Sequence, residues 1–172
     1  MHNDNSIRYG SITRIFHWSM ALLIGWQMLK FFDRIRDGEH WVGQTLVPWH
    51  ISIGTLLLVL IVARIIWVAK QPVRPEPDPA TAFFVQAGHI LLYAGMVAMP
   101  ITGILAMLGG GHGWTAFGVE IAAEGNKIPW AESIGSLHSP IAWLLLILTV
   151  GHIGMALLHH FVQKDDVLKR MI

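Results

Sequence analysis

Leu137–Val162 reads LHSPIAWLLLILTVGHIGMALLHHFV, an apolar run that carries His138, His152 and His159. An α-helix rises about 1.5 Å and turns about 100° per residue. As a helix, this run would place His138 and His152 about 21 Å apart along its axis and within about 40° of the same face. Two imidazoles on one face, one near each end of a membrane-spanning helix, predict two sites stacked across a membrane.

Composition assigns the chain to the membrane proteins. Of its 172 residues, 53% are hydrophobic and only 13% are charged, which is unlike a soluble domain. A helix needs about 20 apolar residues to cross the hydrocarbon core. We therefore predict an all-α membrane protein, with residues 1–172 forming a single four-helix transmembrane bundle. The expected spans are approximately 15–32, 49–69, 82–108 and 137–162.

The absence of cysteine limits the chemistry. It excludes disulfides, iron–sulfur clusters, thiolate zinc sites and covalent haem attachment through a C-x-x-C-H motif. Ten histidines remain as candidate ligands. The net charge of +1 gives no indication of a nucleic-acid partner.

Basic residues predict the orientation. The first apolar run is too long for the core of a cleavable signal, so we expect it to remain as a span. If the N-terminus is cytoplasmic, more Lys and Arg residues lie inside than outside, in agreement with the positive-inside rule. The inner set is Arg8, Arg14, Arg64, Lys70, Arg74, Lys164, Lys169 and Arg170, and the outer set is Lys30, Arg34, Arg36 and Lys127.

Four histidines fall at two matched depths. His50 begins the second run and His138 begins the fourth, whereas His17 lies early in the first run and His152 late in the fourth. Because successive spans alternate in direction, His50 should meet His138 near the outer face and His17 should meet His152 near the inner face. Each pair would give bis-histidine ligation of a low-spin haem, which suits electron transfer because no coordination position stays open.

Other roles for these histidines are open. Histidine can be a hydrogen-bonding group between membrane helices, although four at two matched depths favour a functional pathway. Zinc or copper transport would require carboxylate or sulfur near histidine, and no acidic residue lies inside the four runs. Ligation by Met99, Met107 or Met155 is a further alternative.

Arg64 and His89 are secondary candidates at the inner site. Arg64 follows His50 by fourteen residues and so shares nearly the same helix face, about 21 Å away. It would either extend to the cytoplasmic headgroups or pair with a haem propionate, which the shared face favours. His89 could replace His17 as a ligand, but we favour a hydrogen-bonding role.

Several short motifs resemble the bacterial cytochrome b561 family, and together they cover nearly the whole chain. They are Phe16-His17-Trp18, Trp49-His50-Ile51-Ser52-Ile53-Gly54, Arg64, Gly88-His89 with Tyr93, Phe117-Gly118, and His159-His160-Phe161 with Lys164-Asp165-Asp166-Val167-Leu168-Lys169-Arg170-Met171. The resemblance implies a multi-pass bundle in the bacterial inner membrane with two non-covalent b haems. It also implies His17, His50, His138 and His152 as the axial ligands.

The resemblance implies electron transfer between a periplasmic reaction and ubiquinone. One branch of the family is superoxide oxidase, and related proteins are the cytochrome b subunits of nickel–iron hydrogenases. We rank a general periplasm-to-ubiquinone electron carrier first. The alternatives are a superoxide:ubiquinone oxidoreductase, a haem-b membrane anchor of a periplasmic dehydrogenase or hydrogenase, and a structural or transport bundle without redox activity.

His159 is the candidate quinone ligand. It lies seven residues past His152, which is about 10 Å closer to the cytoplasm and about 20° around the helix. Its imidazole could donate to a quinone carbonyl and relay a proton, or it could satisfy the last carbonyls of the helix and complement the helix dipole. Arg74 and Arg14 are weaker candidates for the same site, and His160 points about 100° away.

Charge at the outer face guides the choice of donor. Superoxide is an anion, and its rapid capture would need a positive potential. Six acids face the four outer bases, although Arg34 and Arg36 could form a local basic funnel. The acids are Asp33, Asp37, Glu39, Glu120, Glu124 and Glu132. This balance suits a basic protein donor at least as well as superoxide.

Overall fold

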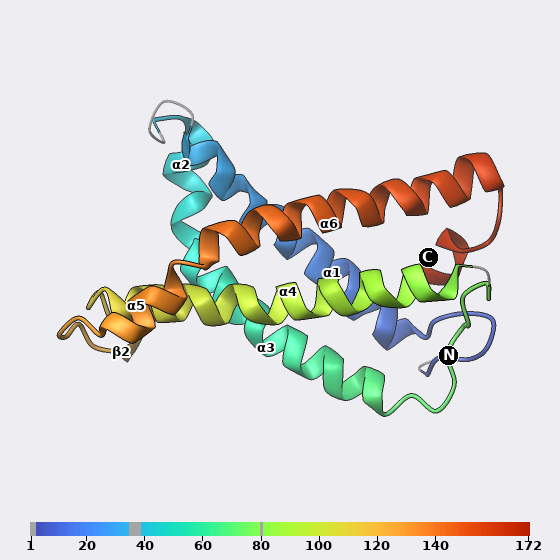
Figure 1. Cartoon of the computed structure of the whole chain (residues 1–172), viewed down its shortest axis with the longest axis horizontal. Coiled ribbons are helices and arrows are strands. Elements are labelled where there is room, and N and C mark those ends of the chain that lie inside the picture. Colours follow the sequence, from blue (N-terminus) through green and yellow to red (C-terminus); the bar gives the residue numbers. More distant parts are fainter. Residues whose placement is uncertain (1–2, 35–38, 80) are drawn as a thin grey trace.

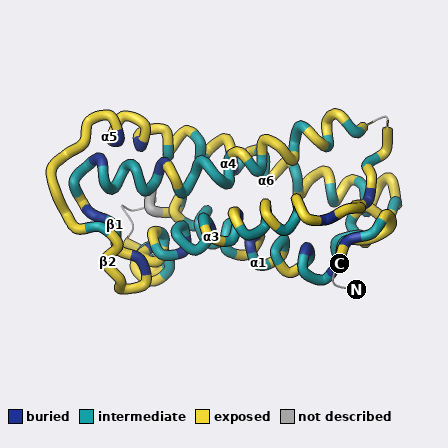
Figure 2. Tube along the Cα trace, turned by 90° about the horizontal axis from the view of Figure 1, so that it is seen from below, coloured by how far each residue is buried: buried dark blue, intermediate teal, exposed yellow. Residues whose placement is uncertain are grey.

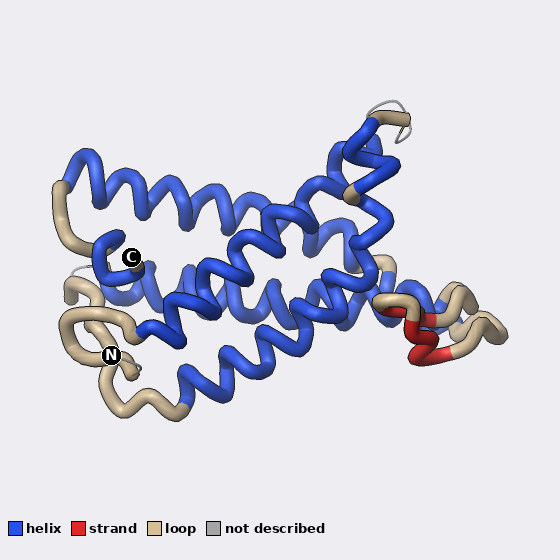
Figure 3. Tube along the Cα trace, turned by 180° about the vertical axis from the view of Figure 1, so that it is seen from behind, coloured by secondary structure: helices blue, strands red, loops and turns tan. Residues whose placement is uncertain are grey.

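The computed structural model of the chain describes residues 3–34, 39–79 and 81–172. Within these ranges, four long helices extend between the two ends of the molecule, two along its long axis and two obliquely to it (Figure 1). They are α1 (Ser11–Met28), α3 (His50–Ala69), α4 (Ala82–Gly109) and α6 (His138–Leu158). Both chain ends lie at one end of this bundle, named here the terminal end, and the segment between α4 and α6 projects from the other, named here the hairpin end (Figures 1 and 3).

Three helical stretches are long and apolar enough to cross a membrane. Among the described residues they are Trp41–Ala69, Ala82–Gly109 and Pro129–Gln163, and they contain the second, third and fourth predicted spans. The first predicted span falls on α1 and the 3-10 helix η1 (Leu29–Arg34), which are not among them. Three of the four predicted spans are thus supported by length and composition.

The surface of the bundle is apolar. Val59, Ile147 and Val150 are each more than 60% exposed, and Figure 2 shows that most of the chain is exposed or only half-buried. Moving such a side chain from water into hydrocarbon is favourable by about 1.5–3 kcal/mol. Lipid is therefore the expected surrounding, and the protein is an integral membrane protein.

The helices pack as two pairs. α1 packs mainly on α3 and α6 on α4, while contacts between α3 and α4 join the pairs. The buried core lies between α1 and α3 and consists of Met20, Ile53, Leu57 and Ile61. Each histidine pair joins the two helix pairs, because His50 of α3 and His17 of α1 both meet histidines of α6.

Short helices complete the connections. α2 (Trp41–Thr45) and the 3-10 turn η3 (Val47–Trp49) precede α3, with Pro48 in the turn just before His50. The final segment contains a π-helix, η4 (His159–Gln163), and a 3-10 helix, η5 (Leu168–Met171). As the sequence predicted, α3 and α6 begin at His50 and His138.

The chain is not wholly helical, because a β-hairpin that the sequence did not predict lies between α4 and α6. Strands β1 (Trp114–Ala116) and β2 (Val119–Ala122) pair antiparallel around Phe117 and Gly118, which both have positive φ, 52° and 78°. The Trp114 indole N–H donates to Thr55 Oγ1 at 3.1 Å, and the Phe117 N–H donates to Ser52 Oγ at 2.9 Å. The hairpin is therefore fixed to the first two turns of α3.

Helix α5 (Pro129–Gly135) packs backbone to backbone against the last turn of α4. A Cβ atom on Gly135 would lie 2.5 Å from Ala106 Cα, and one on Gly109 would lie 2.2 Å from the Glu132 backbone nitrogen. Only glycine permits such a close approach. These contacts fix the direction from which the chain enters α6 at His138.

Candidate functional site

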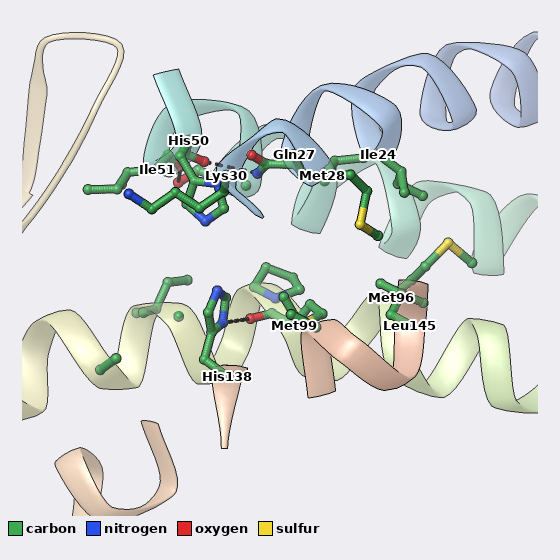
Figure 4. A pocket seen from close by; sticks show the side chains of 18 of the residues that line it. Ile24, Gln27, Met28, Lys30, His50, Ile51, Met96, Met99, His138 and Leu145 are labelled. Carbon is green, nitrogen blue, oxygen red and sulfur yellow. Dashed lines mark hydrogen bonds between the residues drawn. The ribbon is translucent and has the colours of Figure 1, made fainter. Parts of the chain in front are cut away.

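His50 and His138 form a pair at the hairpin end. Their ring centroids are 6.0 Å apart and the ring planes are nearly perpendicular, at 88°. Both side chains point into a cavity of about 480 Å³ from opposite sides (Figure 4). Residues of α1, α3, α4 and α6 line this cavity, whose size is within the range of about 300–1,000 Å³ that is usual for cofactor sites.

The protein fixes the orientation of the His138 ring. Its Nδ1 atom lies 2.9 Å from the Met99 carbonyl oxygen and 3.3 Å from Thr102 Oγ1. Since a carbonyl oxygen only accepts hydrogen bonds, Nδ1 carries the proton and Nε2 keeps the lone pair that a metal needs. Gly103 leaves room for the ring, because a Cβ atom there would lie 3.0 Å from His138 Cε1.

Methionine side chains make the cavity wall apolar and conformationally adaptable. The five that line it are Met20, Met28, Met96, Met99 and Met107. Met155, also named as a possible ligand, does not line the cavity and is 53% exposed. Flexible thioether side chains of this kind adapt their packing to an irregular apolar surface.

A second pair lies toward the terminal end. The ring centroids of His17 on α1 and His152 on α6 are 6.2 Å apart, with planes tilted by 57°. The His89 ring on α4 lies 5.8 Å from that of His152. His17 and His152 are half-buried, whereas His89 is exposed. Both residues that the sequence proposed as partners of His152 are therefore beside it, and His17 is the more enclosed.

Arg64 faces the interior at this second pair. Its Nε donates to the Tyr93 hydroxyl at 3.1 Å, and its guanidinium carbon lies 5.4 Å from the Tyr93 ring centroid. It also interacts electrostatically with His17, His89 and His152. The guanidinium is thus held beside the imidazoles, where it can meet the carboxylate of a bound group.

Both pairs have the spacing that one metal ion requires. An imidazole nitrogen binds a metal at about 2 Å, which places the ring centroid about 3 Å from the metal and two opposed centroids about 6 Å apart. The observed separations of 6.0 Å and 6.2 Å match this value. Within the described part of the chain, no three His, Cys, Asp or Glu side chains gather as a metal site. Two ligands per site suit a metal whose remaining ligands belong to a macrocycle.

The residues predicted to bind quinone all lie at the terminal end, but each has different contacts. His159 Nδ1 lies 2.5 Å from Asp165 Oδ2, and this hydrogen bond holds the pKa of the Asp165 carboxyl below its usual value. Arg14 donates to the Ile172 carbonyl oxygen at 2.6 Å. Arg74 is exposed in the link between α3 and α4, near Tyr9. His159 therefore binds an acidic side chain instead of the last helix carbonyls.

Among the residues whose side chains the structure describes, acidic groups outnumber basic ones at the hairpin end. Glu39, Glu120, Glu124 and Glu132 are exposed, as is Lys127, while Lys30 borders the cavity of His50. The predicted basic funnel at Arg34 and Arg36, together with Asp33 and Asp37, lies outside the residues whose side chains the structure describes.

Sequence reasoning missed the groups that orient His138. Thr102, Gly103 and the Met99 carbonyl are on α4, and their proximity to α6 depends on the relative register of two helices. A small residue beside a polar one is common in membrane helices, so these positions carry no distinctive local signal.

Comparisons with known proteins match one family over nearly the whole chain. A family model described as prokaryotic cytochrome b561 matches residues 8–172. The chain is 35% identical to cytochrome b561 homolog 2 of Escherichia coli (strain K12) over 181 residues, covering 96% of this chain and 91% of that protein. It is 29% identical to probable superoxide oxidase CybB of Yersinia pestis over 175 residues, covering 96% of each.

Proposed function

Because the chain belongs to the prokaryotic cytochrome b561 family, we propose that it is a di-haem b electron-transfer protein that passes electrons between a periplasmic donor and ubiquinone. The observation that carries this proposal is the presence of two imidazole pairs with the centroid separation of opposed metal ligands. His138 and His152 lie on one helix, fourteen residues and about 21 Å apart. Such a spacing suits two haems in series across the membrane.

Each site has a defined set of residues. His50 and His138 would hold the outer haem, with the Met99 carbonyl fixing the His138 ring. His17 and His152 would hold the inner haem, and His89 would hydrogen-bond beside it. Arg64, oriented by Tyr93, would pair with a haem propionate. When bound, the haems supply one-electron chemistry, and the protein supplies ligands, charge partners and an apolar wall.

The proposed orientation places the terminal end in the cytoplasm. Most of the described Lys and Arg residues lie in the segments at that end, which supports a positive-inside arrangement. α1 would then be the fourth span. Its 18 residues reach about 27 Å, and Trp26, close to its end, suits one membrane interface.

We place ubiquinone reduction at the terminal end, beside the inner haem. The contact of His159 with Asp165 fixes the imidazole and engages Nδ1. When the imidazole carries both protons, Nε2 is the atom that can donate to a quinone carbonyl and pass a proton to it. Arg14 and Arg74 would contribute positive charge at the same quinone site.

Haem content and redox titration test the proposal. We expect the purified protein to contain two b-type haems per chain, both low-spin, and to show two separable midpoint potentials because the two sites differ in charge. Chemically reduced protein should be reoxidised by a short-chain ubiquinone. Colourless protein that lacks a Soret band would exclude the proposed function.

Superoxide oxidation is the second candidate. It is supported by the relative named probable superoxide oxidase and by Lys30, a cation that borders the cavity of His50 and His138. The exposed glutamates at the hairpin end oppose it, because they repel an anion. Rapid mixing of superoxide with oxidised, quinone-loaded protein distinguishes the candidates. We expect slow haem reduction, and a rate near the diffusion limit that falls with added salt would reverse the ranking.

A further inference from the structure

The chain reverses direction immediately after α6. The helix continues as the π-helix η4, and Lys164 then adopts a left-handed conformation with φ of 55°. Asp165 stabilises the turn, because one carboxylate oxygen contacts His159 Nδ1 and the other accepts from the Val167 N–H at 3.0 Å. The segment Lys164–Ile172, named here the strap, folds back to the terminal end, where the C-terminus lies near the N-terminus (Figures 1 and 3).

Three consecutive carbonyl groups of the strap bind α1 and the residues before it. The Tyr9 N–H donates to the Arg170 carbonyl at 3.1 Å, and the Trp18 indole N–H donates to the Met171 carbonyl at 2.9 Å. The Ile172 carbonyl accepts from Arg14 at 2.6 Å and also from Arg8.

The strap also contacts the opposite side of the terminal end. Arg170 donates to the Glu76 carbonyl at 3.0 Å, in the link between α3 and α4. The strap therefore joins the end of α6 to α1 and to this link.

This connection matters because the inner histidine pair spans the two halves of the bundle. His17 belongs to α1, which packs mainly on α3, whereas His152 belongs to α6, which packs on α4. Trp18, which binds the strap, directly follows His17. His159, which begins the reversal, lies seven residues after His152. The strap thus attaches close to both imidazoles along the chain.

We propose that the strap ties α6 to α1 and thereby fixes the separation of His17 and His152. It is a positioning element for the inner pair, and its effect on haem ligation rests on the function proposed above. The inference also gives a structural role to the motif that ends the sequence. Asp165 stabilises the reversal, while Arg170 and Met171 present the carbonyl groups that bind the amino-terminal segment.

Distance measurement between spin labels tests the tie without reference to haem. The chain has no cysteine, so labels can be placed only at Ile15→Cys on α1 and Val150→Cys on α6, where the native side chains are 66% and 61% exposed. We expect one narrow distance in the full chain in nanodiscs. Deletion of residues 168–172 should cause loss of that single distance and a shift to longer, broader values.

Two point variants accompany the deletion. Trp18→Phe keeps an aromatic ring but removes the N–H that binds Met171, so it should broaden the distance distribution in the same direction. Lys169→Ala is the matched control, because it breaks only an ion pair with Asp166 in which both side chains are at least 65% exposed. It should leave the distribution unchanged. An unchanged distribution in the deletion variant overturns the proposal.

Carbon monoxide gives a second readout in the haem-loaded protein. A bis-histidine haem has no open position and does not bind carbon monoxide, so the parent protein and Lys169→Ala should be inert. The deletion variant should gain a carbon monoxide-binding fraction confined to the inner haem. If the protein contains no haem, the proposed function fails while the label distances still decide whether the strap ties the helices.

Discussion

Replacing His138 with alanine should remove the outer haem and leave the inner haem in place, so that the haem content falls from two per chain to one. The substitution removes one axial bond, and the residues described as lining the cavity include no third histidine to replace it. His50→Ala should have the same effect, because His50 faces His138 across the cavity. His17→Ala and His152→Ala should instead remove the inner haem. Haem extraction and low-temperature absorption spectra measure both outcomes.

Two further variants control this series. His112→Ala removes an exposed histidine near the hairpin end that belongs to neither pair, and it should retain both haems. Gly103→Val keeps His138 but places bulk where even a single Cβ atom would lie 3.0 Å from the ring, so the outer haem should be weakened or lost. Two low-spin haems in all four histidine variants would refute the ligand assignment. Retention of the inner haem in His17→Ala and its loss in His89→Ala would assign that ligand to His89.

The same series separates ligation from a purely structural role. A histidine that only links helices contributes about 1 kcal/mol through its hydrogen bond. Its replacement would lower the melting temperature without changing the haem spectrum. Loss of one spectral component is therefore the result that is diagnostic of a ligand.

Helix periodicity was sufficient to predict which histidines meet. The depth of each imidazole follows from its position in an apolar run, and alternating span direction then pairs His50 with His138 and His17 with His152. The structure confirms both juxtapositions, whereas haem binding by these residues stays a prediction. The family resemblance is confirmed over residues 8–172.

The first predicted span is less apolar than the other three because polar groups interrupt it. Thr13, Arg14 and Gln27 lie within α1 or at its ends and lower its hydropathy relative to the other spans. Each has a tertiary role, since Thr13 bonds to Asp4 and Trp67, Arg14 to the strap, and Gln27 to the His50 carbonyl. Polar contacts of this kind form only when the helices are packed, so they have no periodic signature in the sequence.

The hairpin and the strap could not be predicted for a similar reason. The hairpin turns at Phe117, a residue type that seldom adopts positive φ, and its strands are held by side chains of α3. The strap is recognised through its backbone carbonyls, which do not depend on residue type. The sequence of the strap therefore indicates a family resemblance, but it does not indicate which residues the strap contacts.

Replacing His159 with alanine should slow reoxidation of the reduced protein by ubiquinone at least about tenfold, the cost of one hydrogen bond in a desolvated site. The Nε2 atom of His159 is the proposed donor to the quinone carbonyl. His152, on nearly the same helix face, lies about 10 Å farther from the cytoplasm and is assigned to the haem. The measurement is stopped-flow mixing of chemically reduced protein with a short-chain ubiquinone, followed at the haem α-band. Haem spectra must remain those of the parent protein.

Two controls isolate this effect from the role of His159 at the start of the strap. Asp165→Asn keeps one oxygen that can accept from His159 Nδ1 but loses the second oxygen, which accepts from the Val167 N–H. The variant therefore weakens the reversal while the imidazole keeps a partner, and quinone kinetics should remain close to those of the parent. His160→Ala removes the neighbouring imidazole, which points about 100° away from His159 around the helix. This variant should also have little effect on the rate of reoxidation by ubiquinone. Unchanged quinone kinetics in His159→Ala would exclude His159 from the site, and equal slowing in Asp165→Asn would assign the effect to the geometry of the strap. If His159→Ala is reoxidised slowly by ubiquinone while both control variants are reoxidised at the parent rate, the imidazole itself is the group that binds the quinone.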